Sequence, residues 1–130
     1  MVIPSSLDQI EVVESLAEKA ADVMHFNDDE KDSLAIAVTE AVNNAIIHGN
    51  KLDKNKKVHV RFAFEGKKII VTIKDEGQGF DPESLTDPLA PENLLKESGR
   101  GIFILKSLMD EVEFSFNSSG TILKMVKSKK

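Results

Sequence analysis

The first third of the chain has apolar residues at the spacing of amphipathic helices. From Ser5 to Met24 they recur every three or four positions, and the serines that open this segment are its expected N-terminal cap. The segment 27–50 repeats the pattern, with Asp28 or Asp29 as the expected cap and Gly49 as the expected stop. The pattern therefore predicts two consecutive helices.

The period changes to two after residue 57. Apolar side chains alternate with polar or small ones over 58–64, which predicts a strand with one buried face. The tetrapeptide "EGKK" is a turn signal, and the β-branched run "KIIVTIKD" after it predicts a second strand. We expect these two strands to form a hairpin.

The last part of the chain begins with a stretch rich in Gly, Pro, Asp and Ser, 75–101, which predicts a long loop. The segment 101–112 predicts a helix opened by Gly101, and 112–127 predicts a closing hairpin. Helices and strands thus come in blocks, which favours an α+β fold: a two-layer sandwich whose mixed or antiparallel sheet is covered on one face by helices. The length of 130 residues predicts a single domain over 1–130.

Composition narrows the class of protein. No apolar stretch is long enough to span a membrane, and the N-terminus lacks the pattern of a signal peptide, so we expect a cytoplasmic protein with no membrane partner. The absence of cysteine excludes disulfides and thiolate chemistry. A net charge of −5 argues against nucleic-acid binding.

Three polar residues interrupt the second predicted helix. Glu40, Asn44 and His48 are four residues apart, so on an α-helix they form one polar ridge beside an apolar face. Buried amides and carboxylates without partners cost free energy, so the ridge needs a partner.

Three further segments carry candidate chemistry: "DEGQGF" after the second strand, "SGRG" at the start of the third helix, and "GT" at the start of the last strand. Each alone has a common structural explanation, such as a turn, a tight entry into a helix or an ordinary strand residue. The residues concerned are, in chain order, Asp75, Gly77, Gly79, Gly99, Arg100, Gly101 and Thr121.

Together and in this order, the four segments resemble the sequence boxes of the ATPase superfamily shared by gyrase, the mismatch-repair ATPases and histidine kinases. Within it, "TEAVNNAIIHGN", "DEGQGFDP", "ESGRGIFILKSLMDEVEF" and "GTILKM" resemble the small bacterial anti-sigma factor serine kinases. The resemblance covers residues 7 to 126. It implies a histidine-kinase-like ATPase fold, with ATP or ADP and Mg²⁺ as the ligands of the polar ridge.

The resemblance also implies roles for the ridge. Asn44 is expected to bind Mg²⁺ through its amide oxygen, because this hard cation prefers oxygen ligands. Glu40 is expected to be the base that orients or deprotonates the attacking hydroxyl; the alternative is that it orients the waters of the magnesium ion. His48 either touches phosphate or closes the helix, and the helix end is the favoured interpretation.

For the other boxes, the resemblance implies that Asp75 accepts a hydrogen bond from the adenine amine and that Thr121 joins through a water. Gly77 and Gly79 let the backbone pass close to the base and sugar. Glycines 99 and 101 are expected to aim backbone N–H groups at the phosphates. Arg100 either adds charge there or faces solvent, and 80–98 is the expected lid.

The implied activity is a serine/threonine-protein kinase whose substrate is an anti-sigma factor antagonist, and which itself holds a sigma factor inactive. Homodimerisation is also expected from the resemblance alone. The alternative is a nucleotide-sensing adaptor without catalysis, or a phosphatase activator, of the same fold; loss of Glu40 or Asn44 would have favoured it, and both are present.

Overall fold

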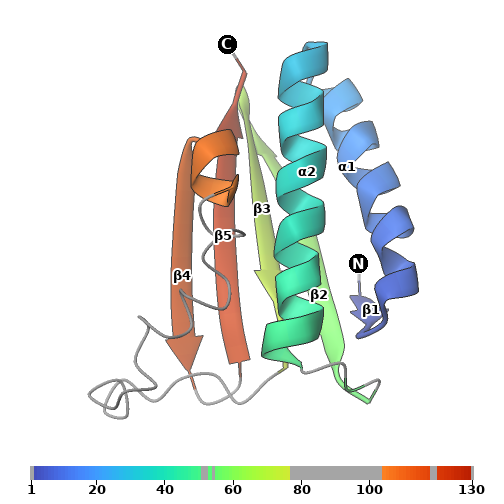
Figure 1. Ribbon diagram of the computed structural model, residues 1–130. Coiled ribbons are helices and arrows are strands. Elements are labelled where there is room, and N and C mark those ends of the chain that lie inside the picture. The colour runs from blue at the N-terminus through green and yellow to red at the C-terminus, as the bar shows by residue number, and fades with distance from the viewer. Residues whose placement is uncertain (1, 51–52, 54, 77–103, 118–119, 130) are drawn as a thin grey trace.

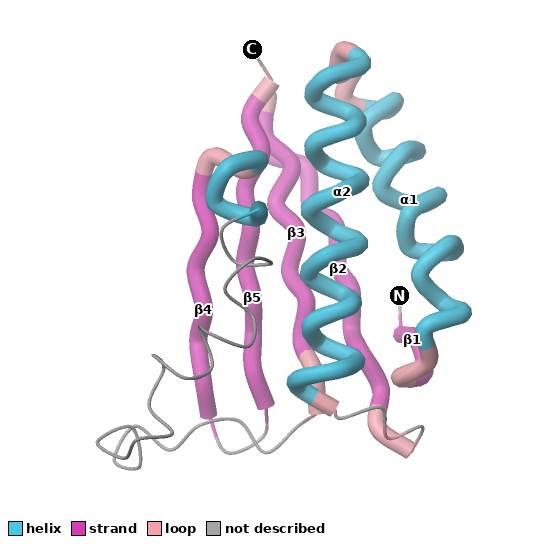
Figure 2. Tube along the Cα trace, viewed as in Figure 1, coloured by secondary structure: helices cyan, strands magenta, loops and turns pink. Residues whose placement is uncertain are grey.

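The computed structural model describes residues 2–50, 53, 55–76, 104–117 and 120–129 (Figures 1 and 2). The elements are the strand β1 (Val2–Pro4), a 3₁₀ turn η1 (Leu7–Gln9), the helices α1 (Ile10–Val23) and α2 (Asp28–Asn44), a π-helical turn η2 (Ala45–Gly49), and the strands β2 (Lys57–Glu65), β3 (Lys68–Lys74), β4 (Glu111–Asn117) and β5 (Gly120–Ser128). Residues 104–108 are also helical. No helix in the described ranges is both long and apolar enough to cross a membrane.

The strands form one sheet in the order β1-β2-β3-β5-β4, and every neighbouring pair is antiparallel. Helices α1 and α2 lie side by side over one face of this sheet, and the helical residues 104–108 lie over the same face beside them (Figures 1 and 2). The predicted two-layer α+β sandwich is therefore confirmed, with a purely antiparallel sheet.

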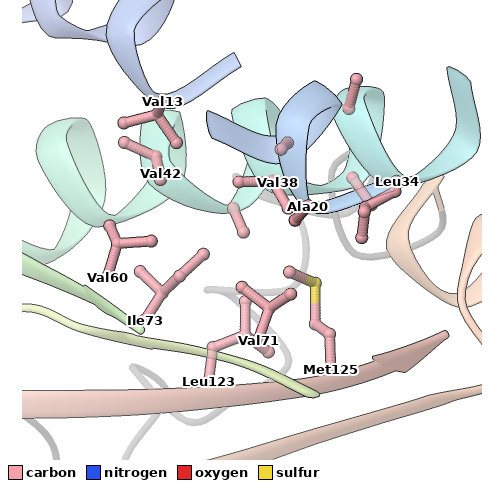
Figure 3. Packing of buried hydrophobic residues seen from close by; sticks show 14 of the residues in the cluster. Val13, Ala20, Leu34, Val38, Val42, Val60, Val71, Ile73, Leu123 and Met125 are labelled. Carbon is pink, nitrogen blue, oxygen red and sulfur yellow. The ribbon is translucent and has the colours of Figure 1, made fainter. Parts of the chain in front are cut away.

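The core lies between the helices and the inner face of the sheet. Val60 of β2 is opposite Ile73 of β3, and Val71 of β3 is opposite Met125 of β5, so their side chains share that face. Figure 3 shows these side chains pointing toward Val38 of α2. All five are at most 2% exposed. The alternating apolar residues that predicted β2 lie on this inner face of the sheet, and the residues between them lie on its outer face.

The prediction of a helix over 101–112 is wrong at its end. Its start lies outside the described residues, but the helix ends at residue 108 and β4 begins at Glu111. Glu111 and Val112 pair with Val126 and Met125 of β5. Ladder hydrogen bonds and burial of Val112 against the core outweigh the helical spacing of these residues.

The predicted caps of the first two helices also differ from the structure. Ser5 caps nothing: it is 1% exposed and its hydroxyl donates to the Lys56 carbonyl at 2.7 Å. Ser6 precedes η1, but its hydroxyl binds the Asp8 carboxylate instead of a backbone N–H group. Directly before Ser5 lies the short strand β1 (Val2–Pro4), which the sequence pattern did not predict.

The N-cap of the second helix lies one residue before the first of its predicted caps. Asn27, not Asp28 or Asp29, is the N-cap, and its side chain accepts from the Glu30 N–H at 2.8 Å. The Glu30 carboxylate accepts from the Asn27 N–H at 2.9 Å, which completes a capping box. The two aspartates lie in the first turn, where their charges favour the helix dipole.

Candidate functional site

One end of the sandwich brings together three segments that are far apart in the sequence. The C-terminal end of α2, the C-terminal end of β3 and the N-terminal end of β5 lie there (Figure 1), and η2 contacts β5. These segments carry Asn44, Asp75 and Thr121, which the sequence predicted to share a site.

Asp75 and Thr121 bind each other directly. The Asp75 N–H donates to the Thr121 carbonyl at 3.1 Å, and the Thr121 N–H donates to Asp75 Oδ1 at 3.0 Å. The Asp75 residue is 4% exposed. A carboxylate accepts more than one hydrogen bond, so the bond from Thr121 orients the group without exhausting its capacity as an acceptor.

Gly120 is required for this contact. Its φ is +141°, and a Cβ at this position would lie 2.2 Å from the Asp75 carbonyl oxygen and 3.0 Å from Asp75 Oδ1. The backbone of β5 can approach Asp75 this closely only without a side chain.

We expect Gly120→Ala to lower the free energy of unfolding by at least about 2 kcal/mol, because it combines a backbone clash with an unfavourable φ. Urea denaturation measures this change. Gly66→Ala is the matched control: Gly66 also has positive φ, +59°, but nothing lies within 4 Å of its added Cβ. It should cost about 1 kcal/mol. Equal losses in the two variants would contradict the steric role of Gly120.

Glu40 and Asn44 lie one turn apart on α2, as predicted. Both are half-buried. In the described part of the chain, neither side chain makes a hydrogen bond or ion pair, and no buried side-chain polar atom there lacks a partner. Their polar atoms therefore reach solvent beside an apolar helix face, which leaves them available to a ligand.

The third member of the predicted ridge is displaced by the change of helix type. From Ala45 to Gly49 the helix is a π-helix, in which the Asn50 N–H donates to the Ala45 carbonyl at 2.8 Å. One turn is then longer than four residues, so His48 does not follow Asn44 at the α-helical spacing. The backbone places His48 in the last turn of the helix, and Gly49 ends that turn as predicted.

Two residues that sequence reasoning missed support this end of the sandwich. Asn50 is 1% exposed, and its Oδ1 accepts from the Glu76 N–H at 2.7 Å. The Glu76 carboxylate accepts from His59 Nε2 and from the Lys57 N–H, each at 2.9 Å. The hydrogen bond from His59, followed by that from the Lys57 N–H, holds the pKa of Glu76 below its ordinary value. The only signal in the sequence was an asparagine directly after the expected helix stop.

The glycine boxes lie outside the described residues. This applies to the predicted site residues Gly77, Gly79, Gly99, Arg100 and Gly101, and to the expected lid at 80–98. Among the described residues, no group of three or more His, Cys, Asp or Glu side chains could hold a metal ion.

Comparison with known proteins identifies the family. The family model described as "Histidine kinase-like ATPase domain" matches residues 3–127. The chain belongs to the histidine kinase-like ATPase family. Serine-protein kinase RsbW of Bacillus subtilis (strain 168) is 33% identical over 133 residues, which cover 98% of this chain and 82% of the relative. The protein of the same name from Staphylococcus epidermidis is 39% identical over 109 residues, 77% of this chain and 66% of the relative. Within the family, the chain belongs with these serine-protein kinases, as the sequence resemblance predicted.

Solved structures of this ATPase family share the fold. The catalytic domain of the histidine kinase ThkA superposes with a TM-score of 0.54 at 15% identity, covering 99% of this chain and 96% of that domain. The histidine kinase domain of the Erythrobacter litoralis EL346 blue-light activated kinase gives 0.55 at 14% identity, covering 98% of this chain and 62% of that one. At these identities the likeness concerns the fold alone, and it agrees with the predicted histidine-kinase-like ATPase fold.

The geometry fits an adenine nucleotide in two respects. Asp75 provides a buried acceptor whose orientation is set by Thr121, which suits the amino group of adenine. Asn44 provides a half-buried amide with no protein partner in the described ranges, which suits a hard cation.

Proposed function

We propose that this chain is an ATP- and magnesium-dependent serine/threonine-protein kinase that acts on an anti-sigma factor antagonist. The observation that carries the proposal is the pair Glu40 and Asn44, two half-buried polar side chains without a protein partner in the described part of the chain. They lie on α2, whose C-terminal end is at the same end of the sandwich as the Asp75–Thr121 pair (Figure 1). A magnesium–nucleotide complex would supply the partner that these two side chains lack among the described residues.

The pair on α2 has two roles in this proposal. Asn44 binds the metal through its amide oxygen; when bound, Mg²⁺ offsets the charge of the phosphates. Glu40 takes the proton of the attacking serine or threonine hydroxyl, whose oxygen bonds to the γ-phosphorus as the bond to the β-phosphate oxygen breaks and ADP leaves. A side chain that reaches solvent from a helix is suited to both tasks, because within the described part of the chain neither residue must first give up a protein partner.

Asp75 and Thr121 are proposed to hold the adenine. An ionised carboxylate only accepts hydrogen bonds, so it suits the amino group of adenine and opposes the carbonyl of guanine. The contributions of His48 and of the glycine boxes, including Arg100, remain predictions from the sequence.

The partners are proposed from the sequence resemblance. It implies that the substrate is an anti-sigma factor antagonist, that the kinase also binds a sigma factor, and that it works in the cytoplasm as a homodimer. Its relatives are named serine-protein kinases, and this supports a protein hydroxyl as the phosphate acceptor.

The test is incubation of the purified full chain with γ-labelled ATP, Mg²⁺ and candidate antagonist proteins. We expect label on a serine or threonine of one antagonist, and none when Mg²⁺ is chelated, because the phosphoryl charge then lacks its counterion. Binding of nucleotide without transfer to any antagonist would contradict the kinase proposal and favour the nucleotide-sensing adaptor.

A further inference from the structure

The buried Asn50 side chain joins three segments that are distant in the sequence. Its Nδ2 donates to Ser5 Oγ at 2.7 Å and to the Lys57 carbonyl at 3.0 Å, and its Oδ1 accepts from the Glu76 N–H at 2.7 Å. Its own N–H closes the π-helical turn on Ala45 at 2.8 Å. The Lys57 carbonyl can only accept and the Glu76 N–H can only donate, so the amide nitrogen and oxygen of Asn50 cannot exchange places.

The bond to Glu76 acts on Asp75. The Glu76 N–H belongs to the peptide group that follows Asp75, so Asn50 holds that peptide plane from one side. On the other side, the carbonyl of the same peptide lies against Gly120, and the Asp75 side chain accepts from the Thr121 N–H. The backbone angle that directs the Asp75 carboxylate is thus fixed between Asn50 and β5.

Asn50 also belongs to the turn that ends α2. Its N–H donates to the carbonyl of Ala45, and Ala45 directly follows Asn44, the last residue of α2. One side chain therefore links the end of the helix that carries Glu40 and Asn44 to the strand end that carries Asp75. The Ser5 contact adds the residue after β1 to the same network.

We propose that Asn50 is a positioning residue for the nucleotide site: through the Glu76 N–H it sets the direction of the Asp75 carboxylate relative to the end of α2. This inference rests on the proposed function, because it assumes that Asp75 receives the adenine. In this proposal Asn50 does not touch the nucleotide; it acts only through the peptide group after Asp75.

The test compares two variants of the same network. Asn50→Ala removes the acceptor of the Glu76 N–H, and we expect the dissociation constant for ADP to rise at least about tenfold, the effect of misplacing one hydrogen bond to a charged group. Ser5→Ala is the matched control: Ser5 is also 1% exposed, but its loss leaves the bond between Asn50 and Glu76 in place. The dissociation constant of Ser5→Ala for ADP should stay within about twofold of the wild type, even if this variant has a lower free energy of unfolding. ADP titration of the full chain, well below each melting temperature, gives both values.

A conservative variant separates positioning from mere stability. Asn50→Asp keeps an oxygen for the Glu76 N–H but loses the donor to Lys57, so it should be less stable than the wild type. We expect its ADP affinity nevertheless to be restored to within about threefold of the wild type, because the acceptor is kept. Should Asn50→Ala not fold, Asn50→Ser takes its place. Its shorter side chain also loses the Glu76 contact while leaving room for a water, and the same tenfold loss is expected.

A second readout needs no nucleotide. The Thr121 N–H is bonded to the Asp75 carboxylate, so its amide NMR signal reports where that carboxylate lies. We expect the signal to move in Asn50→Ala and to stay in Ser5→Ala. If the alanine variant (or the serine variant in its place) folds with an unchanged Thr121 signal and ADP affinity, the proposal is wrong. If the wild type binds no nucleotide, the proposed function fails, and the Thr121 signal alone still decides whether Asn50 positions Asp75.

Discussion

Glu40→Gln is expected to lower the rate of phosphotransfer to an antagonist protein by at least about 100-fold, with ADP affinity within about twofold of the wild type. The amide has the shape of the carboxylate but cannot accept the proton of the attacking hydroxyl. Because the Glu40 side chain has no hydrogen bond or ion pair within the described part of the chain, the substitution breaks no internal contact there. Single-turnover transfer from γ-labelled ATP gives the rate, and titration with ADP gives the affinity.

Asp32→Asn is the matched control, since Asp32 is an exposed acid on the same helix. It removes the same charge two turns away and should leave the rate within about twofold. Equal rates for wild type and Glu40→Gln would refute the assignment of Glu40 as base. If Glu40 instead orients the waters of the magnesium ion, raising the Mg²⁺ concentration should restore much of the lost rate, whereas a lost base is not restored in this way.

Asp75→Asn is expected to raise the dissociation constants for ATP and ADP at least about tenfold, the value of a hydrogen bond to a charged group. The amide places an N–H donor where the carboxylate offered an acceptor, so either the adenine amine or the Thr121 N–H loses its partner. The preference for ATP over GTP should shrink at the same time, because an amide donor tolerates the guanine carbonyl. Calorimetric titration with each nucleotide measures both effects.

Asp110→Asn provides the control for this second prediction. Asp110 Oδ2 also accepts a backbone N–H of β5, that of Ser128 at 2.6 Å, but at the opposite end of the strand. This variant changes the same chemistry away from the site and should bind ATP like the wild type. An unchanged dissociation constant in Asp75→Asn would remove Asp75 from the adenine site.

Much of the fold could be predicted because burial imposes a period on the sequence. The alternation of apolar residues over 58–64 reflects the two faces of β2, and the spacing of three and four in α2 reflects its packing on α1 and on the sheet. The same reasoning failed where the secondary structure of a segment depends on a strand elsewhere in the chain that pairs with it. Glu111 and Val112 continue a helical pattern in the sequence but belong to β4, because they pair with the backbone of β5. The strand β1 is three residues long, too short to show any period.

Candidate site residues could be proposed from the sequence where a polar side chain interrupts an apolar pattern. Glu40 and Asn44 stood out as polar residues in an apolar helix, and both reach solvent without a protein partner in the described ranges. The family resemblance predicted that Asp75 and Thr121 share one site through a water, but it did not predict the direct hydrogen bonds between them. That Gly120 must lack a side chain follows only from the approach of two backbones 45 residues apart along the chain.

By itself, the sequence determined which residues are buried and which chemical groups are available, since both follow from local period and residue type. Tertiary structure alone decided which distant backbones meet. The π-helical turn after Asn44, the place of Asn50 between Ser5 and Glu76, and the end of the last helix before β4 all depend on such meetings. A hydrogen bond across 26 or 45 residues leaves no periodic trace, because its energy depends on where the partner lies in space and not on neighbours along the chain.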